Sequence, residues 1–210
     1  MKLLTSMLLG VLLSFGTTVF AQSGAPKSSA PPAAPKPVAH SDSLKSVDTP
    51  APSEAQKSFD TMKTFAGEWE GPVKVDPPMP NMTDGNPLMH VSMRVTSRGN
   101  VLVHEFQEAN TPLDATKYDH PVTMLYVDGD QLNLIHYCDA GNRPHMVARK
   151  SPDGRTVEFD FVDLSGGTQY GHMHHAVFTY LDANHHTEDW TYMMPGDKPV
   201  HAHVDLQRAK

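Results

Sequence analysis

The chain has 210 residues, which is room for one ordinary domain with additional segments at its ends. Asp and Glu total 24 against 17 for Lys and Arg, giving a formal net charge of -7. This balance argues against a nucleic-acid-binding protein, because counterion release needs a basic face. A single cysteine, Cys138, excludes an intrachain disulfide, and the unusual part of the composition is its 13 histidines and 12 methionines.

The first 21 residues have the pattern of a secretory signal peptide. Lys2 provides the positive start, residues 3–15 are mostly apolar, and Ala21 is a small residue of the kind that signal peptidase accepts. We therefore expect cleavage after Ala21 and export to the periplasm or the extracellular space, with an uncleaved membrane anchor as the alternative. No later stretch approaches the roughly 18 apolar residues of a membrane helix, so we expect no integral membrane segment after cleavage.

Residues 22–52 consist largely of Ala, Pro and Ser and contain almost no aromatic or branched side chains. Such a segment cannot bury enough apolar surface to fold, so we expect an extended, disordered tether. The remaining residues, 53–210, then form one domain, which holds every histidine except His40.

The segment 53–65 is the helical candidate, because Ser53 can cap it and Phe59, Met62 and Phe65 recur at helical spacing. The rest of the chain alternates in polarity between turn sequences, as β-strands do. We place ten strands near residues 67–75, 88–98, 101–110, 120–128, 131–138, 143–150, 155–162, 171–182, 185–194 and 199–207. This order predicts an all-β fold, an antiparallel up-and-down barrel preceded by one short helix, because closure removes exposed sheet edges. A β-sandwich is the alternative.

Several motifs resemble those of known barrels. The sequence Phe65-Ala66-Gly67-Glu68-Trp69-Glu70-Gly71 resembles the Gly-x-Trp opening of calycin barrels, which include lipocalins, fatty-acid-binding proteins and nitrobindin-like haem barrels. A second set resembles a family of exported bacterial proteins of uncharacterised function: His136-Tyr137-Cys138, Gly141-Asn142-Arg143-Pro144, Gly171-His172-Met173-His174 and Trp190-Thr191-Tyr192. The resemblance covers about residues 55–208. Calycin barrels usually hold one small ligand inside, so it implies binding more than catalysis.

The hairpin around residues 128–130 decides one inward face. A three-residue turn sets Tyr126 opposite Leu132, and the shared face is then Val122, Met124, Tyr126, Leu132, Leu134, His136 and Cys138. A two-residue turn would set the leucines beside Thr123 and Leu125 instead. We expect the three-residue turn, because its apolar face is more continuous.

The hairpin around Ala183 gives a second face, consisting of His172, His174, Ala176, Phe178, Tyr180, His186, Glu188, Trp190 and Tyr192. We expect this face to point inward, because aromatic rings bury the larger area. In the last strand an aliphatic face alternates with His201 and His203, which are therefore expected to face solvent.

Two histidines in a His-x-His pattern share one face of a strand and can form a two-ligand arm for zinc, copper or iron. The predicted metal ligands are His136, His172 and His174. Histidines that only form hydrogen bonds are the alternative. A haem held by His201 or His203, as the resemblance to nitrobindin-like barrels implies, requires one of them to point inward. The cofactor is thus unknown from the sequence, with zinc or haem as candidates.

We expect an interior site for a small, apolar molecule rather than an active site. The predicted ligand-binding residues are Tyr126, Leu134, His136, Cys138, Phe178, Trp190 and Tyr192. Enzymatic alternatives are a thiol nucleophile at Cys138 and a hydrolytic metal held by His172, His174 and Glu188. A partner-binding module with a filled barrel is a further alternative. The oligomeric state does not follow from the sequence.

Overall fold

The structure, a computed structural model, describes residues 51–79, 87–114, 116–149 and 154–210. It contains one α-helix, α1 (Glu54–Lys63), and one 3-10 turn, η1 (Ser97–Gly99). The strands are β1 (Gly67–Asp76), β2 (Leu88–Thr96), β3 (Val101–Glu108), β4 (Val122–Asp128), β5 (Gln131–Tyr137), β6 (Asn142–Arg149), β7 (Thr156–Gly166), β8 (His172–Asp182), β9 (His185–Met194) and β10 (Lys198–Arg208). All ten lie where the alternation of the sequence predicts them.

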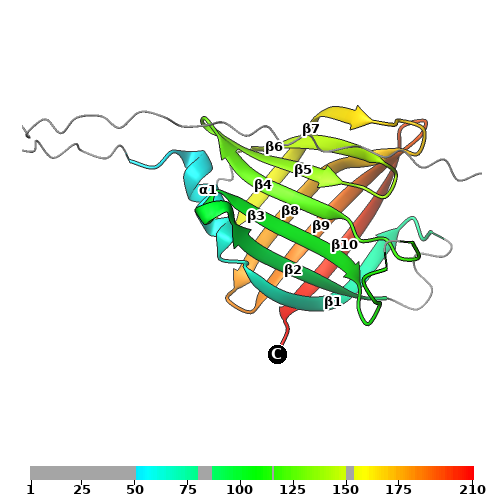
Figure 1. The fold of residues 1–210 in the computed structure, drawn as a ribbon, viewed down its shortest axis with the longest axis horizontal. Helices are drawn as coiled ribbons and strands as arrows, with labels where there is room; N and C mark the ends of the chain where they lie inside the picture. The colour runs from blue at the N-terminus through cyan, green and yellow to red at the C-terminus, as the bar shows by residue number, and fades with distance from the viewer. Residues whose placement is uncertain (1–50, 80–86, 115, 150–153) are drawn as a thin grey trace, which may run out of the picture. The chain divides into compact units, whose positions relative to one another are not determined.

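The strands form one closed antiparallel barrel in the order β1-β10-β9-β8-β7-β6-β5-β4-β3-β2 (Figure 1). Each strand therefore pairs with its sequence neighbours, and β1 closes the barrel by pairing with β10. The predicted up-and-down barrel is confirmed, and the alternative of two packed sheets is wrong.

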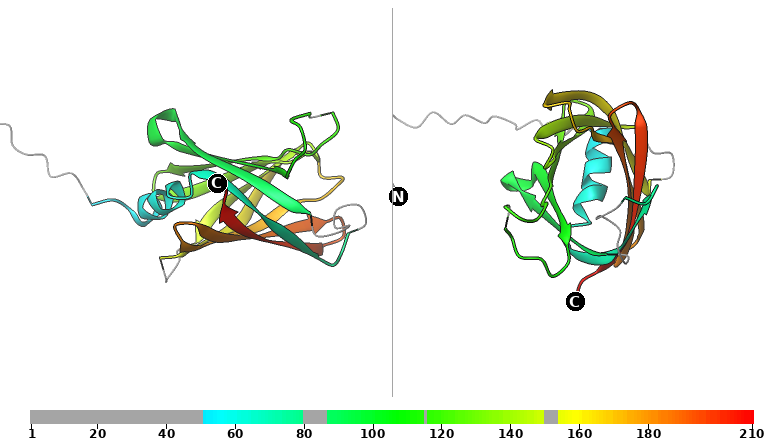
Figure 2. Two further views of the ribbon diagram at one scale, coloured as in Figure 1. Left: turned by 90° about the horizontal axis from the view of Figure 1, so that it is seen from below. Right: turned by 90° about the vertical axis from the view of Figure 1, so that its right-hand side faces the viewer.

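The helix α1 lies at one end of the barrel, against β4 and β5 (Figure 1 and the right-hand view of Figure 2). Ser53 caps it by accepting a hydrogen bond from the Gln56 amide at 3.1 Å. Phe59 and Met62 are buried, and Phe65, just beyond the helix, stacks on the ring of His186. This end of the barrel is therefore covered by the apolar face of α1.

The barrel interior is densely occupied in the half nearer α1. Trp69 is 1% exposed, and its Nε1 donates a hydrogen bond to the Phe65 carbonyl at 2.7 Å. The fully buried side chains include Leu102, Leu125, Leu134, Met146, Phe159, Phe178, Val204 and Leu206. This half is a packed core rather than a cavity.

The described residues belong to one compact unit. The predicted signal peptide and nearly all of the predicted tether lie outside the described residues. Within the described residues, no helix is long and apolar enough to cross a membrane.

Candidate functional site: the barrel end away from α1

The barrel end opposite α1 leaves inward-facing side chains partly uncovered. We call five of these apolar side chains the mouth residues: Val75, Phe106, Phe161, Met173 and Ala202. Each packs against the buried core but is only partly buried itself, and together they come from β1, β3, β7, β8 and β10. Beside them, on the inward faces of β5 and β9, lie His136 and Trp190, which are 4% and 6% exposed. Trp190 is the cross-strand partner of the mouth residue Ala202. We call this imidazole and this indole the floor of the mouth.

The predicted ligand-binding residues lie at different depths. Leu134 and Phe178 are completely buried in the core, so a ligand reaches them only by displacing core side chains. His136 and Trp190 lie on the floor of the mouth. Cys138, just past the end of β5, and Tyr192 of β9 are half-buried at the rim.

The prediction that Tyr126 faces the interior is wrong. Asp128 pairs with Gln131, so the hairpin has two turn residues, and Leu125 and Thr123 lie opposite Leu134 and His136. Tyr126 is therefore on the outer face of β4, beside Asn133. The two-residue turn is possible because Gly129 has a φ of 56°, which glycine adopts without steric cost. The inward face of β5 is unchanged by this correction.

The predicted inward face of β9 is confirmed. Its His186 and Glu188 side chains are 0% exposed, and Trp190 is nearly as deeply buried. Phe178 and Ala176 of β8 lie opposite Glu188 and Trp190 and are buried with them.

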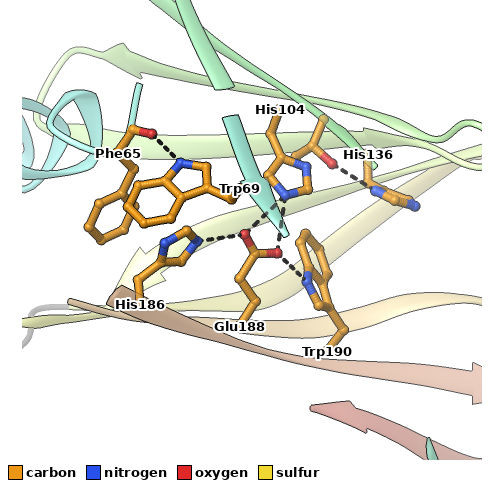
Figure 3. Close-up of polar contacts among 8 residues, drawn as sticks. Phe65, Trp69, His104, His136, His186, Glu188 and Trp190 are labelled. Atoms are coloured by element: carbon orange, nitrogen blue, oxygen red, sulfur yellow. Dashed lines mark hydrogen bonds and ion pairs between the residues drawn. The ribbon is translucent and has the colours of Figure 1, made fainter. Parts of the chain in front are cut away.

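A buried carboxylate lies at the centre of this interior (Figure 3). Glu188 accepts hydrogen bonds from Trp190 Nε1 at 2.9 Å, from His104 Nε2 at 3.0 Å and from His186 Nε2 at 3.2 Å. Because a carboxylate only accepts, both histidines must carry a proton on Nε2. Burial raises the pKa of Glu188, but His104 and His186 outweigh it and hold the pKa below its ordinary value of 4.5. The core therefore contains an ionised, fully paired glutamate.

His136 forms a separate contact beside this cluster. Its Nδ1 lies 2.8 Å from the Thr123 hydroxyl, and its ring centroid lies 5.6 Å from that of Trp190. Burial, together with the neighbouring His104, lowers the pKa of His136 to about 3. His136 is thus a neutral imidazole in the physiological pH range.

The predicted metal ligands are not brought together as a set of three. His172 Nε2 and His174 Nδ1 lie 3.1 Å apart, and both rings contact Phe161. A different group of three candidate ligands is found among the described residues: Glu158, Asp160 and His175. Their ligand atoms all lie within 4.8 Å of one another. That group is partly buried and is already occupied by the guanidinium of Arg149, which pairs with both carboxylates.

A bulge in β8 also changes the predicted face. The pairing between β8 and β9 shifts between Met173 and His175, so Met173, and not His172, lies opposite Tyr192. Met173 accordingly packs against the core.

His201 and His203 face away from the interior, as the alternation predicts. His201 is exposed and lies beside the Thr191 hydroxyl, while His203 Nδ1 lies 2.6 Å from the Asp189 carboxylate. The inward positions of β10 are Val200, Ala202, Val204 and Leu206, which offer no axial ligand. A haem held by either histidine does not fit this arrangement.

Cys138 lacks the environment of a nucleophile. Partial burial raises the pKa of its thiol to about 11, and Asp139, at 3.6 Å from Sγ, contributes in the same direction. His136 directs its Nδ1 at Thr123 instead. The thiol is therefore protonated near neutral pH and unactivated.

The sequence reasoning missed several residues of this region. His104 and Thr123 contact the floor residues, and Phe106 and Phe161 are mouth residues. The alternation Leu102, His104, Phe106 in β3 was the available signal, since two apolar side chains flank the histidine on one face of the strand. Thr123 is assigned to the inward face, opposite His136, once the hairpin is given a two-residue turn.

Two surface grooves lie outside the barrel. One, of about 740 Å³, runs beside β1 and the carboxyl terminus and is lined by Glu70, Leu88, Asp205 and Arg208 among others. The other, of about 180 Å³, is lined mainly by polar outward side chains of β1, β2 and β3. Neither includes a mouth residue.

Comparisons with known proteins give a fold without an activity. No protein-family model and no curated protein matches the chain. The solved structure of Rv2717c from M. tuberculosis is similar with a TM-score of 0.52 at 14% identity, over 73% of this chain and 98% of that one. A protein of unknown function from the DUF3598 family of Nostoc punctiforme is similar over 70% of this chain and 48% of that one, with a TM-score of 0.37 at 9% identity. The first likeness supports the barrel fold alone.

Proposed function

We propose that this chain is a binding protein that holds a small, largely apolar molecule in the mouth of the barrel. The supporting observation is the partial exposure of the mouth residues, whose apolar side chains point inward from β1, β3, β7, β8 and β10. Exposed apolar surface that converges from several elements above a few polar groups is typical of small-molecule sites.

The packed core limits how deep the ligand lies. Leu134, Phe159 and Phe178 leave no exposed surface, so the ligand rests above them, on His136 and Trp190. This differs from a deep interior cavity of the kind that the sequence alone favours. The proposed site is accordingly a shallow one.

Two features favour binding over catalysis. The His104 and His186 imidazoles are both occupied by Glu188, and the Cys138 thiol is protonated. These two imidazoles and this thiol thus provide neither an activated nucleophile nor a poised general base.

We also propose that the chain is exported, on the basis of the amino-terminal pattern of residues 1–21. An exported binding barrel would meet its ligand in the periplasm or outside the cell.

The binding proposal is tested with the uncharged fluorescent probe N-phenyl-1-naphthylamine, titrated into the mature protein. We expect saturable enhancement of probe fluorescence. Ala202→Phe places a ring among the mouth residues and should weaken binding about tenfold or more. His201→Phe adds a ring one residue earlier, on the outer face, and should leave the affinity unchanged. Equal effects of the two variants, or the absence of saturable binding, would contradict the proposal.

A further inference from the structure

We propose that His136 is the polar anchor of the mouth and donates a hydrogen bond from Nε2 to an uncharged acceptor on the ligand, such as a ketone or amide carbonyl. This inference rests on the proposed binding function and adds the chemical class of the ligand.

The contact with Thr123 determines which nitrogen of His136 carries the proton. Thr123 is 1% exposed, and its hydroxyl forms no other hydrogen bond within the described part of the chain. A buried hydroxyl hydrogen needs an acceptor, and the acceptor within reach is Nδ1. Thr123 therefore donates to Nδ1, and the neutral ring carries its hydrogen on Nε2.

The Nε2 of His136 remains available. No described residue accepts a hydrogen bond from it, and it is not sealed in the core as the unpaired Nδ1 atoms of His104 and His186 are. Figure 3 shows this edge of the ring pointing away from Glu188 and from the Phe65 end of the barrel. A nearly buried donor without a partner is therefore directed towards the mouth.

The neighbouring groups select an uncharged ligand. Trp190 uses its Nε1 on Glu188, so it offers the ligand only its ring. Glu188 lies beside the floor as a carboxylate. Burial raises the pKa of Tyr192 and of the Cys138 thiol, and the negative charge of Asp139 near the rim adds to both shifts. These charges disfavour an anion at the mouth, and His136 is itself neutral, so it cannot compensate one.

The arrangement therefore combines one N–H donor with aromatic and aliphatic walls. A planar, uncharged molecule with a single carbonyl satisfies both, because its ring covers the mouth residues while its oxygen accepts from Nε2. An isostere that lacks the oxygen would leave the donor unpaired in the complex, which is the costly arrangement.

The test compares acetophenone with α-methylstyrene, which has the same shape but carries a methylene in place of the oxygen. Affinities for the mature protein are measured by ligand-observed NMR. We expect acetophenone to bind about fivefold to tenfold more tightly. His136→Phe should abolish this preference while both probes still bind, and Thr123→Val should reduce it, because the tautomer is then no longer held. His201→Phe, at an exposed, outward-facing histidine of β10, should retain the preference.

The ¹⁵N shifts of the His136 ring provide a measurement that needs neither a variant nor a ligand. We expect protonated Nε2 and unprotonated Nδ1, unchanged between about pH 5 and pH 8. Equal affinity for the two probes, or a proton found on Nδ1, would overturn the anchor role and leave the binding function standing. Binding of neither probe would overturn both.

Discussion

Glu188 shows how far a single buried residue depends on its neighbours. It is completely buried, yet three N–H donors from β3 and β9 surround its carboxylate. Such a group is tolerated only while its partners remain, because an unpaired charge in the core carries a desolvation cost of several kcal/mol. His104 and His186 each use Nε2 for this contact, and the second ring nitrogen of each, Nδ1, is buried without a hydrogen-bond partner among the described residues.

Replacing the carboxylate tests this account. We expect Glu188→Gln to lower the free energy of unfolding by about 3 kcal/mol. The neutral amide is a weaker acceptor for the two histidine N–H groups than the carboxylate, and its NH₂ group faces donors instead of acceptors. Glu105→Gln is the control, since that carboxylate is partly exposed and pairs with Arg94 at 3.5 Å; its effect should stay below about 1 kcal/mol. Urea denaturation near pH 7 measures both, and comparable losses would contradict the buried-carboxylate account.

The lowered pKa of His136 predicts how stability depends on pH. The pKa is about 3 in the folded chain and 6.5 in the unfolded one, so between these values only the unfolded chain holds the proton. Stability from this residue is complete above about pH 6.5 and falls as the pH drops towards 3, by about 1.4 kcal/mol per pH unit.

This pH dependence of the free energy of unfolding is measured by comparing the wild type with His136→Gln. From about pH 7 to about pH 4.5, the wild type should lose about 2 kcal/mol more than the variant. His201→Gln alters an exposed histidine and should follow the wild-type curve. Parallel curves for wild type and His136→Gln would show that His136 is not buried as a neutral ring.

At the scale of the elements, the contact between β1 and β10 closes the barrel. Gly71 of β1 lies so close to β10 that a Cβ at this position would overlap the Asp205 carbonyl oxygen. The requirement for glycine here comes from this approach of two strands. A side chain at position 71 would force β1 and β10 apart at this point.

We therefore expect Gly71→Ala to destabilise the fold by about 2 kcal/mol or more, since backbone and not a flexible side chain must move. Glu70→Ala, at the adjacent exposed position, should change stability by less than about 0.5 kcal/mol. Denaturation midpoints compare the two variants, and a Gly71→Ala protein as stable as the control would mean that β1 and β10 are less closely paired.

For the whole molecule, the two ends of the barrel have different roles. At one end α1 inserts Phe59 and Met62 into the core, and at the other the mouth residues stay partly exposed. The proposed ligand therefore reaches the mouth residues from the end away from α1. This asymmetry is what connects the fold to the proposed function.

Export is tested on the whole chain. Expression in a Gram-negative host should give a periplasmic protein whose intact mass corresponds to residues 22–210, because the signal sequence is removed after Ala21. Recovery of the uncleaved chain in the membrane fraction would instead support the anchor alternative.

Local sequence patterns determined the ten strands, the helix and most of the inward faces. Alternation with a period of two residues is a property of each strand alone, so His186, Glu188 and Trp190 could be assigned to one face of a strand before any pairing was known. The same holds for the outward His201 and His203.

Tertiary structure decided what depends on pairing. The two-residue turn at Gly129, which reverses the face of Tyr126, and the bulge at His174, which breaks the His-x-His pattern, are both set by the neighbouring strand. The bond between His104 and Glu188 joins residues 84 positions apart. Alternation says which way a side chain points, but only closure of the barrel determines which side chains meet inside it.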